Sequence, residues 1–310
     1  MRFTPATVGC LGLLSVAASL IGGGPAHAQV TLRYKFKQGE TLNYDLEQKM
    51  KMEMAIAGQN INMSMTQTLD MTWKVESVDN DGKAKITQKF DRVRLSMEGL
   101  PGMDKIQFDS KEGKELEGPF GQIMGPMLKA LAGAEFSMTM DGQGKVSDFK
   151  LPEKLADAFK NISGAAGAGG MFTEEGLKQM MGQASLTFPS EPLTPGKSWE
   201  QKLTMKLPTG GKMNMDNQCT YEGEATADGR KLQKIAMKPK MSVEAEEGAA
   251  VKMKVKNQDA KGTAFFDNQA GHLDHLDLSQ KMDMEVSAGG MDFTQKVEQT
   301  VSFKLKKKAS

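Results

Sequence analysis

Cysteine, aromatic residues and net charge are all scarce in this sequence. The 310 residues include 2 cysteines, 6% aromatic residues and a formal net charge of +1. Cys10 lies in the leader described below, so the rest of the chain holds only Cys219 and cannot form an internal disulfide. A near-neutral charge argues against general nucleic-acid binding, which needs many Lys and Arg side chains. The chain must therefore be held together by packing alone.

Long apolar runs are also missing beyond the N-terminus. Arg2 precedes the apolar stretch 8–21, and Ala26-His27-Ala28 has the A-x-A form of a cleavage site. These features predict a secretory signal peptide over residues 1–28. No later segment approaches the ~20 apolar residues that a membrane-spanning helix needs. We therefore expect an exported protein, periplasmic or secreted, without a transmembrane segment.

Motifs for catalysis are absent. The sequence has no Gly-rich phosphate loop, no G-x-S-x-G motif and no paired histidines of the kind used for metal-dependent hydrolysis. His272 and His275 are three residues apart on a predicted strand, where alternation would place them on opposite faces. Cys219 falls at an apolar position and is expected to be a buried, inert thiol. We expect no enzyme activity, no cofactor and no metal site from these residues.

What the sequence does contain is a long two-residue period. Over residues 42–75, apolar and polar side chains alternate on both sides of 57–60, a stretch with Gly58 and Asn60. This pattern is typical of a β-hairpin with one covered face and one wet face. Folding the hairpin at 57–60 predicts that Met52 lies opposite Met65, and Tyr44 opposite Trp73.

The same alternation recurs to the C-terminus and predicts a mainly β (α+β) fold of curved antiparallel sheets built from long hairpins. Residues 45–53 are similar to residues 277–285, which suggests a repeated hairpin. A parity change at Asp91-Arg92 predicts a β-bulge. Residues 251–255 and 263–266 are interpreted as two separate strands. Helical patterns at 119–132 and 152–181 are expected to cover one side of the sheets.

Four regions follow from these patterns. After the signal peptide of residues 1–28, we expect a first β-rich half over 29–150 and a helical, Gly/Ala-rich connecting segment over 151–188. A second β-rich half then occupies 189–310.

Methionine is unusually frequent, with 25 residues, many of them in Met-x-Met pairs. Thioethers are soft ligands that favour Cu(I), and two residues of strand spacing put both sulfurs on one face. The same positions also suit an ordinary core, because flexible Met side chains fill irregular apolar space. Core packing is the interpretation that the alternation favours.

Glutamines interrupt the predicted apolar faces. An amide in a dry core is costly unless it is hydrogen-bonded, so these side chains either pair across strands or line a partly wet cavity. A cavity of Met and Gln side chains suits an apolar or amphiphilic small molecule. The candidate ligand-binding residues on these faces are Gln48, Met50, Met52, Met63, Met65, Gln67, Gln280 and Met282.

Two motifs carry a resemblance to known proteins: G-E-x-L-x-Y at residues 39–44 and P-G-x-x-W at residues 195–199. Together with the leader and the Met-rich strands, they make the chain similar to an uncharacterised family of exported, planctomycete-type bacterial proteins. The chain more loosely resembles periplasmic lipid and lipoprotein carriers, in which a curved antiparallel sheet wraps around helices.

Three functions remain open from the sequence. The first is a non-catalytic binding or carrier protein for a hydrophobic or amphiphilic small molecule. The alternatives are a structural or assembly protein of the cell envelope, with an envelope protein as partner, and a Met-based copper-binding protein.

Overall fold

The computed structural model describes residues 29–306 except 57, 114, 159–184, 208–210, 228, 247, 250 and 289. The predicted signal peptide, the Gly/Ala tract and the second half of the 152–181 helix lie outside the described residues. Residues 153–158, at the start of that predicted helix, are helical.

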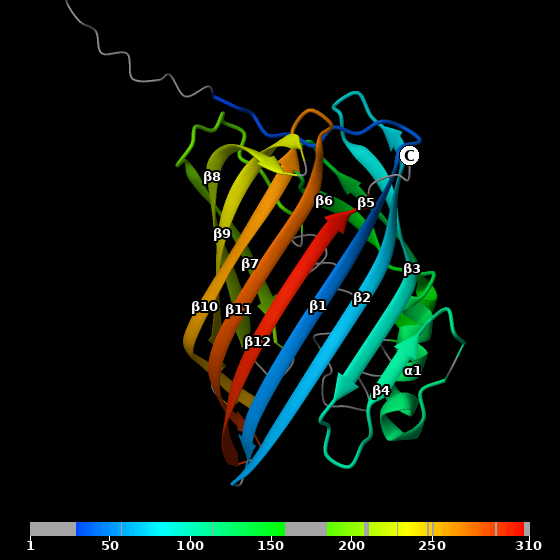
Figure 1. The fold of residues 1–310 in the computed structure, drawn as a ribbon, viewed down its shortest axis with the longest axis vertical. Helices are drawn as coiled ribbons and strands as arrows, with labels where there is room; N and C mark the ends of the chain where they lie inside the picture. The colour runs from blue at the N-terminus through cyan, green and yellow to red at the C-terminus, as the bar shows by residue number, and fades with distance from the viewer. Residues whose placement is uncertain are drawn as a thin grey trace, which may run out of the picture.

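A single antiparallel sheet of 12 strands dominates the fold, in the order β6-β5-β3-β2-β1-β12-β11-β10-β9-β8-β7, with β4 also paired to β3. The predicted β-rich halves share this one sheet, since β1 pairs with β12 over twelve residue pairs. Figure 1 shows these two strands side by side in the middle of a curved sheet. The mainly β, curved antiparallel class predicted from alternation is confirmed. The elements are β1 (Thr41–Ile56), β2 (Gln59–Val78), β3 (Ala84–Glu98), β4 (Ile106–Asp109), α1 (Gly118–Leu131), β5 (Glu135–Met140), β6 (Val146–Lys150), β7 (Ser198–Lys206), β8 (Lys212–Ala227), β9 (Arg230–Glu244), β10 (Val251–Asp267), β11 (His272–Ala288) and β12 (Met291–Leu305).

The first hairpin has the predicted faces but a different register. Met52 pairs with Met63 rather than Met65, and Tyr44 pairs with Met71 rather than Trp73. The cause is a tighter turn, because Ile56 already pairs with Gln59 and Gly58 has φ +80°. A two-residue turn matches the twist of the strands better than the longer loop expected over 57–60. The shift is two residues, so every side chain stays on its predicted face.

Two interruptions of the strand pattern are predicted from the sequence, a β-bulge and a break between two strands, and only the first is confirmed. The bulge at Asp91-Arg92 is confirmed: the register between β2 and β3 shifts between Asp70 and Met71, where Arg92 and Phe90 are the successive partners. The division of residues 251–266 into two strands is wrong. These residues form the single strand β10, and a register shift between Val255 and Asn257 interrupts its alternation. Because a bulge interrupts the two-residue period, it looks in the sequence like the end of one strand and the start of another.

The core lies on the concave side of the sheet and is closed by segments from elsewhere in the chain. Leu32 and Leu193, both 1% exposed, belong to two chain segments that meet at the bridge between Val30 and Leu193. On the β3 side, helix α1 buries Leu128 in the same cluster, and it lies beside β3 and β4 in Figure 1. Helix α1 supplies part of the predicted helical cover, and Pro126 lies inside it.

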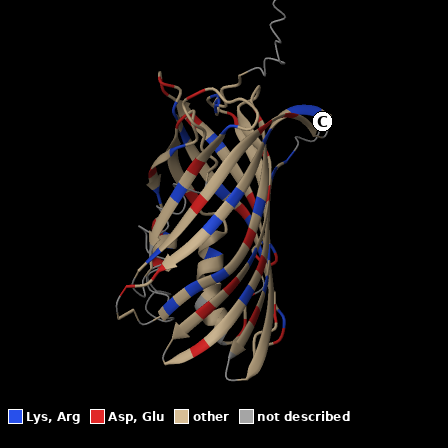
Figure 2. Ribbon diagram, turned by 90° about the vertical axis from the view of Figure 1, so that its left-hand side faces the viewer, with Lys and Arg blue, Asp and Glu red and all other residues tan. Residues whose placement is uncertain are grey.

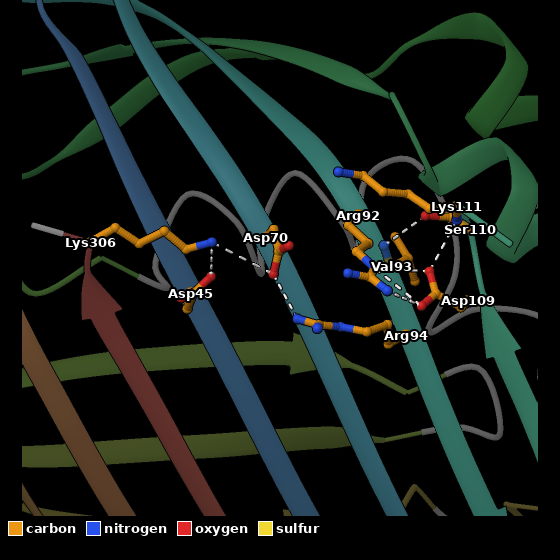
Figure 3. Close-up of polar contacts among 9 residues, drawn as sticks. All are labelled: Asp45, Asp70, Arg92, Val93, Arg94, Asp109, Ser110, Lys111 and Lys306. Atoms are coloured by element: carbon orange, nitrogen blue, oxygen red, sulfur yellow. Dashed lines mark hydrogen bonds and ion pairs between the residues drawn. The ribbon is translucent and has the colours of Figure 1, made fainter. Parts of the chain in front are cut away.

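The convex face carries the charged residues. Figure 2 shows Lys and Arg interspersed with Asp and Glu, and with uncharged residues, along the strands. In Figure 3, Lys306 Nζ lies 2.6 Å from Asp45 Oδ1, and Arg94 Nη2 donates to Asp70 Oδ1 at 2.8 Å. Beside them Arg92 binds Asp109 through two guanidinium nitrogens, and these hydrogen bonds lower the pKa of Asp109 to about 2.

Candidate functional site

A cavity of about 300 Å³ lies between the concave face of the sheet and the segments that close it. Its volume is at the lower end of the range for small-molecule sites. Most of its wall is aliphatic or aromatic, and none of the described residues that line it carries a charged side chain. The lining residues are Tyr34, Tyr44, Leu46, Leu69, Met71, Trp73, Gln88, Phe90, Met138, Met140, Val146, Ser185, Leu186, Leu273, Leu276, Val301 and Phe303.

Alternation explains why these residues meet. Leu46 pairs with both Leu69 and Phe303, and Phe303 pairs with Leu276, so one row of inward positions crosses four adjacent strands. Residues facing each other across a row are close enough for their side chains to touch. The opposite wall comes from Tyr34 and Leu186, which lie outside the sheet.

Aromatic rings give the cavity a rigid wall. The ring of Tyr44 stacks on Phe303 with centroids 4.5 Å apart and lies 5.3 Å from Trp73. The Tyr44 hydroxyl donates a hydrogen bond to the Leu273 carbonyl at 3.1 Å. On the opposite wall, the Tyr34 hydroxyl donates to the Leu186 carbonyl at 3.0 Å. Burial raises the pKa of both tyrosines, so the hydroxyls stay protonated and act as fixed donors.

Two polar residues in the cavity wall, Trp73 and Gln88, were missed from the sequence. They are directly opposite each other on β2 and β3. Gln88 is 4% exposed, and the hydrogen bond that its amide makes is to the Met71 sulfur at 3.5 Å. The alternation could have identified Gln88, because this residue lies between Ile86 and Phe90 at an inward position of the third predicted strand.

The eight candidate residues from the sequence lie together on the concave face, but none lines the cavity. Gln48 pairs with Gln67, Met50 with Met65, and Met52 with Met63. Gln280 and Met282 reach the same face from β11, across the intervening β12. All eight are partly or fully buried. Their ligand-binding role stays a prediction.

Glutamines form a band across this face next to the cavity. Gln48 and Gln67 face each other on β1 and β2, and Gln280 and Gln299 face each other on β11 and β12. Gln280 donates to the Met282 sulfur at 3.0 Å. The side chains of Gln48, Gln67 and Gln299 make no hydrogen bond to another described residue. The inward positions of these four strands carry no charged residue, whereas the outward positions mix Lys, Asp and Glu with Asn, Ser and Thr.

Reactive and metal-binding groups are sparse in the described part of the chain. Cys219 is fully buried, and burial raises its pKa to about 12, which leaves the thiol uncharged. A register shift separates the partners of His272 and His275, so the alternation expected there does not hold; His275 stacks on Phe265 with ring centroids 4.4 Å apart. Among the described residues, no group of three His, Cys, Asp or Glu side chains could hold a metal ion.

A larger hollow of about 540 Å³ lies on the convex face around Gly262. Its wall is mixed, with the charged residues Glu47, Asp277 and Lys304 among the lining residues, and it is open to solvent. It lacks the apolar enclosure that small-molecule sites generally have. The concave cavity is therefore the stronger candidate. No helix in the described ranges is long and apolar enough to cross a membrane.

Solved structures with a similar arrangement are distant in sequence. The chain is 9% identical to lipovitellin, described as a structure of lipid–protein interactions, with a TM-score of 0.46; the match covers 88% of this chain but 26% of the lipovitellin chain. It is 6% identical to the COG4313 outer membrane channel from Pseudomonas putida F1, with a TM-score of 0.23, covering 88% of this chain and 97% of the channel. A DUF1329 family protein from Desulfovibrio piger ATCC 29098 gives 10% identity and a TM-score of 0.16, covering 86% and 87%. These likenesses are too weak to carry an argument about function.

Sequence comparison gives the clearer result. None of the curated proteins matches the chain. A family model described as a family of unknown function (DUF6263) matches residues 81–273, which is more than half of the chain. The resemblance to an uncharacterised family is thereby confirmed, and the chain belongs to this family of unknown function.

Proposed function

We propose that this protein is an exported, non-catalytic binding or carrier protein for an apolar or amphiphilic small molecule. The observation that carries the proposal is the cavity on the concave face, with its aromatic and aliphatic wall and no charged residue among the described residues that line it. Burial of apolar ligand surface against such a wall is the main source of affinity for small molecules.

The surroundings of the cavity support the same function. The concave face continues from the cavity into a charge-free band of Gln, Met and Val side chains, so a ligand longer than the cavity still meets uncharged groups. Flexible Met side chains adapt to varied ligand shapes. The described lining residues offer hydrogen-bonding groups but no thiol, carboxylate or imidazole that would serve as nucleophile or general base.

The test is binding of N-phenyl-1-naphthylamine, whose fluorescence rises in an apolar environment. Val301→Trp adds a large side chain at the cavity wall and should reduce binding at least tenfold. Thr300→Trp is the matched control, because Thr300 is the neighbouring, exposed residue on the opposite face. Circular dichroism and the thermal midpoint should show that both variants fold.

Equal binding by the two variants would contradict the cavity as the site. Native mass spectrometry of protein purified from its host adds an independent measurement, and we expect a co-purifying small molecule. A clean apo mass together with no binding of the dye would refute the function itself.

The register favours copper binding as a second candidate. Met50 faces Met65 and Met52 faces Met63, so four thioethers occupy adjacent positions on one face of β1 and β2. Paired positions have Cβ atoms about 5 Å apart, and thioethers prefer Cu(I). A Cu(I) titration against a competing chelator tests this candidate. Tight binding that Met52→Leu abolishes would support it, and no competition with the chelator would eliminate it.

A further inference from the structure

The polar pair in the cavity wall is short of hydrogen-bond partners. Trp73 Nε1 is buried and has no partner, while the carbonyl of Gln88 accepts no hydrogen bond from a described residue. The Gln88 amide nitrogen reaches only a thioether sulfur, which is a weak acceptor. The surrounding wall is apolar, with Phe90 and Met138 among the neighbours in the cavity.

Such an arrangement costs stability in the empty protein. A buried donor without a partner loses its hydrogen bonds to water and gains none in return. A Phe at position 73 and a Met at position 88 would fill similar space without this cost. In small-molecule sites, a few polar groups on an otherwise apolar wall fix the orientation of the ligand. Trp73 and Gln88 are two such groups side by side, and each can still form hydrogen bonds.

We propose that the cavity selects a neutral ligand with one uncharged polar group, such as an ester, amide or ketone carbonyl or a hydroxyl, attached to an apolar body. The polar group binds between Trp73 and Gln88. The indole N–H donates to the ligand oxygen, and the Gln88 amide supplies a second donor or, for a hydroxyl, an acceptor. The apolar body packs against the rings of Tyr44 and Phe303, which stack 4.5 Å apart.

The cavity disfavours charged ligands because its described wall is uncharged. No charged side chain of a described residue lines it, so a carboxylate or ammonium group would lose water without gaining an ionic partner there. This inference rests on the proposed function, because it specifies the ligand class of the same site.

The experiment compares three probes of similar size: methyl octanoate, octanoate ion and decane. Each is titrated at pH 7 as a competitor of N-phenyl-1-naphthylamine bound to the purified protein. We expect methyl octanoate to bind about tenfold more tightly than either of the others, the gain expected from one or two neutral hydrogen bonds.

Variants then assign the preference to the pair. Trp73→Phe and Gln88→Met keep most of the side-chain volume, and each should weaken the ester about fivefold while leaving decane unchanged. Trp199→Phe is the matched control, because its indole Nε1 already donates to the Thr187 carbonyl at 2.8 Å and the residue lies outside the cavity. It should change neither affinity.

The outcomes separate the two proposals. Equal affinities for ester and decane, unchanged in Trp73→Phe and Gln88→Met, would overturn the ligand class and leave the carrier function standing. Tighter binding of octanoate would overturn it as well, since a charged group would then be preferred. Failure of the dye itself to bind, together with a clean apo mass, would refute the proposed function before the ligand class is tested. The comparison of probes on the unaltered protein does not depend on the variants folding.

Discussion

The seam between β9 and β10 offers a sharp test of how the sheet is held together. These strands pair only between Gln233–Met237 and Gly262–Phe266. Further along the seam, the Gln258 amide takes the place of a backbone rung: its Oε1 accepts from the Met241 N–H at 2.8 Å, and its Nε2 donates to the Met241 carbonyl at 2.9 Å. Gln258→Met keeps the side-chain length and removes both hydrogen bonds.

The expected loss follows from the two bonds. A neutral hydrogen bond contributes about 1 kcal/mol net, and an unpaired backbone group on a partly buried edge adds to the cost when its partner is removed. We therefore expect the free energy of unfolding to fall by about 2 kcal/mol. With an m-value near the upper end of the urea range, the urea midpoint should drop by roughly 0.5–1 M.

Urea unfolding and hydrogen exchange measure the effect globally and locally. Gln295→Met is the matched control: Gln295 lies at an inward position of β12, has no hydrogen-bond partner among the described residues, and should change stability by less than about 0.5 kcal/mol. In Gln258→Met, the Met241 amide should also exchange faster. An unchanged midpoint with an unchanged Met241 amide would refute the idea that this side chain replaces a backbone rung.

Three further predictions concern the acid limit, the thiol and one glycine. The Arg92 hydrogen bonds hold the pKa of Asp109 at about 2, below its usual 3.8, so their contribution to stability is complete above pH 3.8 and is lost as the pH falls through 2. Over this range, acid titration should show the free energy of unfolding falling by about 1 kcal/mol, a value discounted for solvent exposure. Arg92→Met should abolish this pH-dependent loss. Cys219, with a pKa of about 12, should resist alkylation at pH 8 in the folded protein and react at once in urea, and rapid native labelling would contradict its burial. Gly271 has φ +81°, and the Cβ added in Gly271→Ala would lie 2.3 Å from another side chain, so this substitution should lower the free energy of unfolding by more than about 2 kcal/mol. Gly290 has a similar φ of +79° but open space around it, so Gly290→Ala should cost only about 1 kcal/mol.

Alternation predicted which residues face the core because this information is local. Each inward residue of β1 and β2 is two positions from the next, and no other part of the chain is needed to see it. The register was less determined, since shifts of two residues preserve the faces and differ only in the turn. The single strand β10 was hidden for a related reason, as its bulge near Asn257 breaks the period on which the prediction relied.

The cavity could not be predicted in the same way. One part of its wall is the row through Leu46 and Phe303, which depends on the pairing of β1 with β12. The other part comes from Tyr34 and Leu186, which are far apart in the sequence. Contacts over such sequence separations leave no periodic trace. The sequence pointed to the concave face and to its most conspicuous residues, the methionines and glutamines, whose ligand-binding role stays a prediction; the cavity lies beside them on the same face.

The distance between these two regions limits which ligands engage both. Leu46 lines the cavity and Met52 lies on the same strand six residues away, which is about 20 Å at ~3.4 Å per residue. A compact ligand that fills 300 Å³ therefore contacts the aromatic wall without reaching Met52 or Met63. A chain of about 20 Å or more that extends along the strands crosses the glutamine band and meets the methionines. Substitutions such as Met52→Ser should weaken binding of long ligands while leaving short ones unchanged, and equal losses for both would mean that the cavity and the methionine face do not act as successive parts of one site.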